Sequence, residues 1–286
     1  GGGSGHVTAP YVVTPLDGIR RRAEAAGITV LSSPTNNATA AAALAAQADV
    51  TIVVGATSSG EALDRANLLL DADANHDPAE ALIYETAAAA RRTVVLLQVP
   101  GSVLTPWRAS VDAVAAMFLG GQETGSAWAS VLFGDVSPTG KLPVTFPQSE
   151  ADTIAPDGAA EVVYSEGLKT SYRAPGYDPA YPFGHGLSYS NFTYTALAPT
   201  ACVDLAYKAC LGANVTNVGV MAAAVVTQLY ATFPAEAAQP SALLRGFAKS
   251  PTLAPGASAP LVFALTQRDL SHWSEACAPS GWCELD

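Results

Sequence analysis

Residues 120–147 have the sequence GGQETGSAWASVLFGDVSPTGKLPVTFP. The pair of glycines follows an apolar run, an arrangement typical of a strand that ends and turns into a helix. The amphipathic segment after the glycines predicts that helix, the Gly-Asp and Ser-Pro-Thr-Gly sequences predict a turn, and the apolar end predicts a short strand. We therefore expect a strand–loop–helix–turn unit of an α/β domain at this point of the chain.

The sequence before this stretch predicts further strands and helices in alternation. Continuous apolar runs predict buried strands at 49–55, 93–99 and 111–119. Helices are predicted at 15–27, 39–48 and 78–92, and one more short buried strand is predicted at 28–31. Such alternation gives an α/β fold, a mostly parallel sheet flanked by helices.

The character of the sequence changes after residue 147. Segment 148–190 is rich in Tyr, Gly and Pro, and we expect it to be an irregular connecting segment. Short strands are predicted beyond it, at 208–218, 223–233 and 261–265, separated by turn signals at 217–219 and 254–256. We therefore predict an α/β sandwich domain over 1–190 and an all-β sandwich over 191–286.

The composition limits what the chain can bind. Its 286 residues suit about two domains, and 49% hydrophobic residues are enough for packed cores. The formal net charge of −11, with only 14 basic residues, argues against nucleic-acid binding because phosphate contacts need clustered Lys and Arg. No apolar run reaches about 18 residues, so no membrane span is predicted.

The cysteines and the glycosylation sequons favour a secreted protein. The spacing of the four cysteines fits no zinc motif, and the simplest interpretation is two local disulfides, Cys202–Cys210 and Cys277–Cys283. Sequons for N-glycosylation begin at Asn37, Asn191 and Asn214. Each sequon alone is weak, but together with the cysteine pairs they predict an extracellular location.

Two stretches carry a family resemblance. The 120–147 stretch resembles the second domain of glycoside hydrolase family 3 enzymes, and YPFGHGLSYSNFTY at 181–194 resembles a later signature of that family. VTNVG, VTQLYATFP and LAPGASAPLVFALTQRDLSHW resemble the fibronectin type III-like domain, an immunoglobulin-like sandwich that closes many of these enzymes. The resemblance implies that this domain is truncated here, because the family sandwich normally continues with another strand. The resemblance implies the C-terminal portion of a secreted β-glycosidase, foremost a β-glucosidase that removes terminal β-D-glucosyl residues from a glucoside or oligosaccharide.

The same resemblance implies where the chemistry lies. Retaining glycosidases use two carboxyl groups about 5–5.5 Å apart. In family 3 the nucleophilic Asp belongs to a preceding barrel domain, and the acid/base Glu lies on a loop of the second domain. The matching segment here is SSGEALDR at 58–65, in which Glu61 is the acid/base candidate. Asp64 is the alternative carboxylate, although we expect Asp64 and Arg65 to structure the loop.

The residue after Glu61 and the surroundings of its carboxyl group bear on its role as an acid catalyst. Ala62 stands where one related family pattern, SGEG, has glycine. A partner domain that shielded Glu61 from water would raise the pKa of its carboxyl toward neutrality, as an acid catalyst requires.

Other polar and aromatic residues have simpler interpretations. The opening GGGSG resembles a segment at the start of the family's second domain, and we interpret it as a turn, with sugar-site lining as the lesser alternative. Glu123 is expected at a helix start, and His185 is expected to be a packed structural residue without metal-ligand partners. Trp107, Tyr164 and Tyr172 are candidates to stack on sugars, whereas Trp128 is expected in the core.

These inferences set the expected activity. The chain begins with GGGSG rather than Met, so we interpret it as a fragment or processed product that lacks the barrel. It is therefore expected to be inactive alone, to need no cofactor and no metal, and to depend on the missing N-terminal barrel as its partner. The alternatives are a non-catalytic carbohydrate-binding or adhesion module, and a β-xylosidase or N-acetylhexosaminidase relative. The residues that bind the sugar stay unassigned.

Overall fold

The computed structural model describes residues 3–72, 78–155, 158, 160–277 and 280–284. The chain forms two compact units, each assembled from three stretches of sequence. The first unit comprises Gly1–Asp135, Val144–Pro156 and Asp178–Tyr181, and the second comprises Val136–Pro143, Asp157–Tyr177 and Pro182–Asp286.

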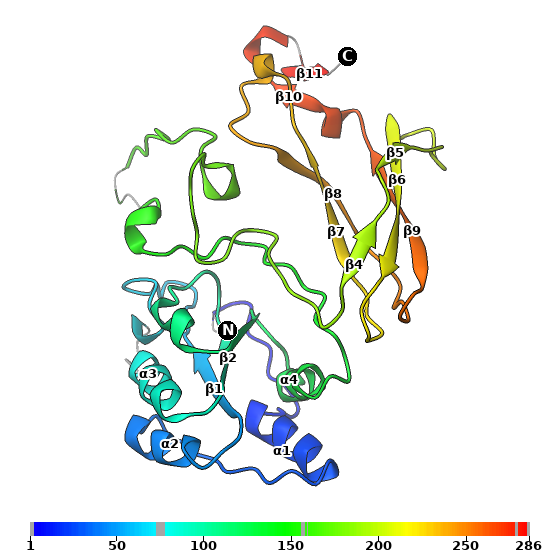
Figure 1. The fold of residues 1–286 in the computed structure, drawn as a ribbon. Helices are drawn as coiled ribbons and strands as arrows, with labels where there is room; N and C mark the ends of the chain where they lie inside the picture. Colours follow the sequence, from blue (N-terminus) through cyan, green and yellow to red (C-terminus); the bar gives the residue numbers. More distant parts are fainter. Residues whose placement is uncertain (1–2, 73–77, 156–157, 159, 278–279, 285–286) are drawn as a thin grey trace. The chain divides into compact units, whose positions relative to one another are not determined.

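The first unit is an α/β structure built on a parallel sheet. Its strands are β1 (Thr51–Ala56), β2 (Thr93–Gln98) and β3 (Ala113–Met117), in the order β1-β2-β3. The helices are α1 (Pro15–Ala25), α2 (Ala38–Ala45), α3 (Ala79–Ala89) and α4 (Thr124–Leu132). Helix α2 packs on α3 and α1 packs on α4, and the two pairs flank the sheet in Figure 1. The predicted fold class of this part is confirmed.

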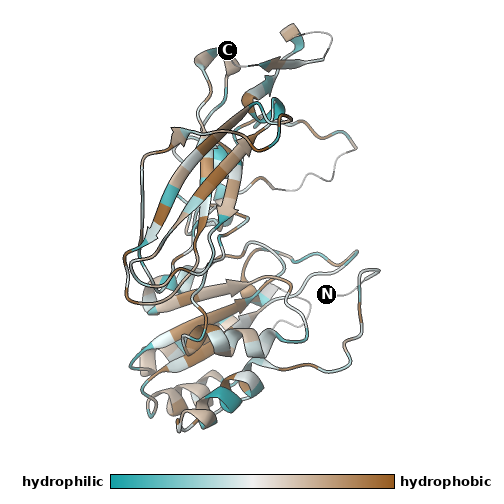
Figure 2. Ribbon diagram, turned by 90° about the vertical axis from the view of Figure 1, so that its right-hand side faces the viewer, coloured by the Kyte–Doolittle hydropathy of each residue, from teal (hydrophilic) through white to brown (hydrophobic). Residues whose placement is uncertain are grey.

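The core of the first unit is apolar and centres on β2. Val95, Leu96 and Leu97 are completely buried, as expected for a central parallel strand that is covered on both faces. Ile83 of α3 and Trp107 join them with no exposed surface. Figure 2 shows the strands of this sheet largely in the hydrophobic colour.

Helices α1 and α4 approach closely because glycines face each other where they meet. A Cβ on Gly18 of α1 would collide with the carbonyl of Gly125, and one on Gly125 would collide with the carbonyl of Thr14. The Gly125 amide donates to the Val13 carbonyl over 2.9 Å, and the Val13 amide donates to the Gln122 carbonyl over 2.8 Å. The side chain of Thr14 caps α1 by accepting a hydrogen bond from the Asp17 amide.

The prediction of a strand at 28–31 is wrong. These residues form no strand, and Ile28 and Leu31 are 52% and 47% exposed. The Ile28 amide donates a hydrogen bond to the Ala23 carbonyl at the end of α1, and Gly27 adopts a left-handed φ of 70°. Residue 28 therefore closes a helix end of the Schellman type, and this apolar segment leaves the helix as an extended, half-exposed connection.

The second unit contains antiparallel strands. Its larger sheet has the order β4-β6-β5, and β9 also pairs with β6. These strands are β4 (Phe192–Tyr194), β5 (Ala198–Pro199), β6 (Ala209–Asn217) and β9 (Ser258–Leu265). Two smaller sheets are formed by β7 (Val226–Ala231) with β8 (Leu243–Lys249), and by β10 (Ser271–Trp273) with β11 (Trp282–Glu284). Short 3-10 turns in the chain are Leu70–Ala72, Pro106–Ser110, Glu150–Asp152, Ser171–Arg173, Ala235–Ala237, Arg268–Leu270 and Glu275–Cys277.

Alternation along β9 builds the core of this unit. Every second residue of β9 is buried, and Leu261 and Phe263 pack with Val215 and Val225. The predicted all-β structure of the C-terminal part is confirmed.

A buried asparagine organises the turn after β6. Asn217 is completely buried, its amide nitrogen donates to the carbonyls of Met221 and Leu253 over 2.8 Å, and its oxygen accepts from the Ser190 hydroxyl and the Gly219 amide. All of these bonds join loops that precede or follow strands. The turn signal at 217–219 thus marks a polar centre as well as a change of direction.

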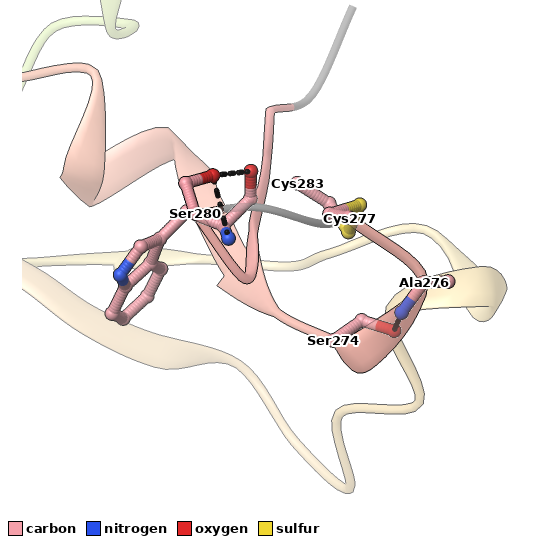
Figure 3. Close-up of a disulfide and its surroundings, with 6 residues drawn as sticks. Ser274, Ala276, Cys277, Ser280 and Cys283 are labelled. Atoms are coloured by element: carbon pink, nitrogen blue, oxygen red, sulfur yellow. Dashed lines mark hydrogen bonds between the residues drawn. A yellow bond between two sulfur atoms is a disulfide. The ribbon is translucent and has the colours of Figure 1, made fainter.

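Two disulfides lie in the second unit. Cys202 is bonded to Cys210, and Cys277 is bonded to Cys283. Figure 3 shows the second disulfide beside Ser274, whose hydroxyl accepts a hydrogen bond from the Ala276 amide. None of the helices in the described ranges combines the length and the apolar character that a membrane crossing requires.

Candidate active-site loop

Glu61 lies at the tip of a tight turn in the loop that follows β1. The amides of Gly60 and Leu63 each donate to the carbonyl of the other, over 3.0 and 3.1 Å, so Glu61 and Ala62 are the two central residues of the turn. Ala62 has a φ of 59°, which is the left-handed conformation that glycine adopts most easily. The turn lies in the loop after the carboxyl end of β1, the side of a parallel sheet on which α/β folds bind ligands.

The carboxylate of Glu61 is exposed, and it accepts hydrogen bonds from Ser4. The Ser4 amide donates to its Oε2 over 2.6 Å, and the Ser4 side chain adds a second hydrogen bond. These bonds, the backbone one foremost, hold the pKa of Glu61 below its ordinary value, and the slight burial of the group opposes them only weakly. In this chain the pKa shift is thus opposite to the raised value expected for a carboxyl shielded by another domain.

Arg65 is fixed through a backbone contact and not through Asp64. One guanidinium nitrogen of Arg65 donates to the Ser102 carbonyl over 3.0 Å, while burial lowers the pKa of the guanidinium. Asp64 is exposed, and within the described residues it forms no ion pair or hydrogen bond with Arg65. Arg65 therefore ties the loop to the segment after β2, and Asp64 stays a solvent-facing carboxylate.

The far end of the loop is held by two carboxylates that sequence reasoning missed. Glu150 accepts a hydrogen bond from the Leu68 amide over 2.6 Å. Glu80 of α3 accepts one from the Leu70 amide over 3.3 Å, and burial raises the pKa of Glu80. Both are acceptors for backbone amides, which leave no pattern in the sequence that would identify them.

A small depression of about 190 Å³ lies at the carboxyl ends of the three strands. Its lining includes Thr57, Gln98, Phe118 and Thr124. The hydroxyl of Thr57 is buried and has no hydrogen-bond partner among the residues that the structure describes. The depression begins one residue after β1, so it adjoins the start of the loop that carries Glu61.

Comparisons with known proteins identify the family. Residues 1–189 match the Glycosyl hydrolase family 3 C-terminal domain, and residues 225–284 match the Fibronectin type III-like domain. The chain belongs to glycosyl hydrolase family 3. The resemblance in the sequence is thereby confirmed.

Known members of family 3 resemble the chain over nearly its whole length. It is 41% identical over 306 residues to probable β-glucosidase L of Aspergillus terreus, which covers 96% of this chain and 41% of that protein. The crystal structure of β-glucosidase D2-BGL from Chaetomella raphigera matches 99% of this chain and 43% of its own, with a TM-score of 0.85 and 34% identity. The β-D-glucoside glucohydrolase of Trichoderma reesei matches 98% and 43%, with a TM-score of 0.87 and 34% identity. The chain spans about two-fifths of the length of these family 3 relatives.

Glu123 and His185, the other polar residues singled out in the sequence, have partners other than Glu61. Glu123 immediately precedes α4 and accepts hydrogen bonds from the hydroxyls of Tyr11 and Ser126, each over 2.6 Å. Burial, aided by the nearby Lys141, lowers the pKa of His185. No cluster of His, Cys, Asp and Glu able to hold a metal ion occurs among the described residues.

The aromatic candidates divide between core and surface. Trp107 and Trp128 are 0% and 3% exposed, so the prediction that Trp107 stacks on a sugar is wrong, because its ring lies in the apolar core. Tyr172 stacks on Phe183, with ring centroids 4.6 Å apart, and Tyr164 is exposed. The side chains of Asn37, Asn191 and Asn214 are also exposed.

Proposed function

We propose that this chain is the C-terminal part of a secreted, retaining β-glucosidase and that Glu61 is the acid/base carboxylate. The observation that carries the proposal is the placement of Glu61 at the tip of an exposed turn after β1, in a chain of family 3. The names of its relatives support a β-linked glucoside as the substrate.

The geometry suits a carboxyl group that acts on a sugar held outside this chain. In the first half of the reaction, Glu61 would donate a proton to the glycosidic oxygen while an Asp of a separate barrel domain attacks the sugar. In the second half, Glu61 would take a proton from the water that releases the glucose. Exposure of Glu61 leaves it open to such a partner surface, and burial against that surface would raise its pKa for the first half.

The domain organisation and processing follow from the same proposal. By family resemblance, residues 1–190 correspond to the second catalytic domain with its connecting segment 148–190 and residues 191–286 to the fibronectin type III-like domain, although the compact units interleave stretches 136–143 and 157–177 with the α/β part. Two disulfides and three exposed sequon asparagines support secretion and N-glycosylation. Arg65 shapes the loop through its bond to the Ser102 carbonyl, while the exposed Asp64 makes no bond to Arg65 among the described residues that would give it the same role.

The test uses Glu61→Gln in a protein that joins this chain to a family 3 barrel. Turnover of an aryl β-glucoside should fall about 10²–10⁴-fold, as for loss of a general acid/base, and added azide should restore part of it. The matched control is Asp64→Asn in the same loop, which should keep most of the activity. Equal losses from both variants, or none from Glu61→Gln, would reject the assignment.

The 286-residue chain alone should not hydrolyse the same substrate, because it supplies one carboxyl group of a pair. Hydrolysis by the isolated chain would show that the nucleophile lies within it. Glucan binding by the joined protein without any hydrolysis would favour a non-catalytic carbohydrate-binding module. Preference for an aryl β-xyloside or N-acetylglucosaminide would place it with the alternative glycosidases.

A further inference from the structure

The opening turn of the chain contacts Glu61 directly. The hydrogen bonds from Ser4 to the carboxylate cross 57 positions of sequence. The His6 amide donates to the Gly3 carbonyl over 3.1 Å, which closes the turn around Ser4. The contact is therefore made by a folded turn and not by an extended chain end.

Gly3 is the residue that lets this turn fit. Its φ of 79° lies in the left-handed region, and a Cβ there would lie 2.6 Å from the Cβ of Glu61 and 2.7 Å from its Oε2. Such separations are far inside van der Waals contact, so any side chain at position 3 would push the turn away from Glu61. Gly5 is different, because a Cβ at that position would meet nothing within 4 Å.

We infer that Gly3 and Ser4 form an N-terminal clamp that positions the carboxylate of Glu61. The catalytic meaning of the clamp rests on the proposed function, whereas the contact of Gly3 and Ser4 with Glu61 is observed in this chain. Two donors from one residue fix the orientation of an otherwise exposed side chain. They also favour the charged carboxylate, which is the form that activates water in the second half of a retaining reaction.

The clamp acts through hydrogen bonds and not through neighbouring charges. The titratable residues nearest to the contact in sequence are His6 on the clamp side and Asp64 and Arg65 on the loop side. None of them is a cause of the lowered pKa of Glu61, which follows from the two bonds to Ser4. A change in the clamp should therefore appear directly in the titration of this one carboxyl group.

The experiment measures the pKa of the Glu61 carboxyl in the 286-residue chain by carbon-13 NMR, with Glu61→Gln to assign the resonance. Gly3→Ala should shift the pKa upward, because it displaces both donors, and deletion of residues 1–4 should shift it in the same direction. Ser4→Ala should give a smaller upward shift, because the backbone donor remains. The matched control is Gly5→Ala, which should leave the titration unchanged.

The outcomes separate the clamp from the catalytic proposal. An unchanged pKa in both Gly3→Ala and the deletion would overturn the clamp, and so would equal shifts in Gly3→Ala and Gly5→Ala. The expected shifts together with full activity of Glu61→Gln in the barrel-joined protein would leave the clamp standing and reject the acid/base role. In that joined protein, Gly3→Ala should also move the pH profile of turnover, which a purely structural role would not do.

Discussion

The turn before α4 and the turn that carries Glu61 each follow a strand of the same parallel sheet, but different forces hold them. At the first turn the main chains of α1 and α4 touch, and Gly125 is buried between them. At the second turn Glu61 is exposed and its carboxylate is held by hydrogen bonds from Ser4. Packing fixes the stretch that is easiest to recognise in the sequence, whereas a few polar contacts fix the residue proposed for the chemistry.

The largest effect should come from filling the contact between α1 and α4. Gly125→Ala forces a methyl group against the Thr14 carbonyl, so the helices must separate, and we expect a loss of about 2–3 kcal/mol in unfolding free energy. Urea denaturation measures it. Gly121→Ala is the matched control in the same motif, because a Cβ at that position meets nothing within 4 Å. Equal stability of the two variants would show that packing does not dominate this turn.

A smaller loss should follow from removal of the cap that begins α1. Thr14→Ala removes the acceptor for the Asp17 amide and should cost about 1 kcal/mol of unfolding free energy. Thr8→Ala, at an exposed position before the helix, should be nearly neutral in the same denaturation experiment. If Thr14→Ala were also neutral, the backbone contacts of α1 with α4 alone would be enough to set the helix start.

At the turn of Glu61 the sign of the effect should reverse. Ala62→Gly removes the cost of placing alanine in the left-handed conformation, about 1–2 kcal/mol. Glycine in turn loses more chain entropy on folding, which costs about 0.5–1 kcal/mol. We therefore expect a small net gain in the free energy of unfolding. Ala66→Gly, in the same loop without a positive φ, should instead lose about 0.4–1 kcal/mol. Thermal denaturation of the two variants compares them. Destabilisation of both would mean that the conformation of Ala62 is not strained.

The smallest effect should be a pH dependence at the turn before α4. Hydrogen bonds from the hydroxyls of Ser126 and Tyr11 lower the pKa of Glu123 below its unfolded value. The stabilisation is therefore present above the unfolded pKa and is lost as the pH falls through the folded pKa. Glu123→Gln should flatten the acid side of a plot of urea midpoint against pH. Glu24→Gln, at an exposed position of α1, should leave the curve unchanged, and equal flattening by both would contradict the assignment.

Local patterns were sufficient to predict most of the fold. The apolar runs at 49–55, 93–99 and 111–119 overlap β1, β2 and β3, because parallel strands are buried on both faces and leave continuous apolar sequence. The run at 28–31 has the same appearance but forms no strand. Its first amide, that of Ile28, donates a hydrogen bond to the last turn of α1 and not to a neighbouring strand, and apolar composition does not reveal which of the two partners is chosen.

The candidate site was predictable only in part. The position of Glu61 followed from its motif, but its contact with Ser4 is a bond to a backbone amide far away in sequence, and backbone donors carry no residue signature. The burial of Asn217 was hidden in the same way, since the sequence marks it only as a turn residue. Asp64 and Arg65 were expected to structure the loop, but the observed bond joins Arg65 to the Ser102 carbonyl, a partner brought near only by the tertiary structure.

The division of the chain into two units of three stretches each has a consequence for recombination. Stretches 136–143 and 157–177 group with the C-terminal strands although residues of the α/β unit lie between and after them in sequence. A single crossover between related genes at residue 135 or residue 190 would therefore combine parts of a unit from two parents. Only exchanges that carry these stretches together with 182–286 would transfer the second unit whole, so chimaeras of such proteins should succeed or fail according to whether they respect this interleaving.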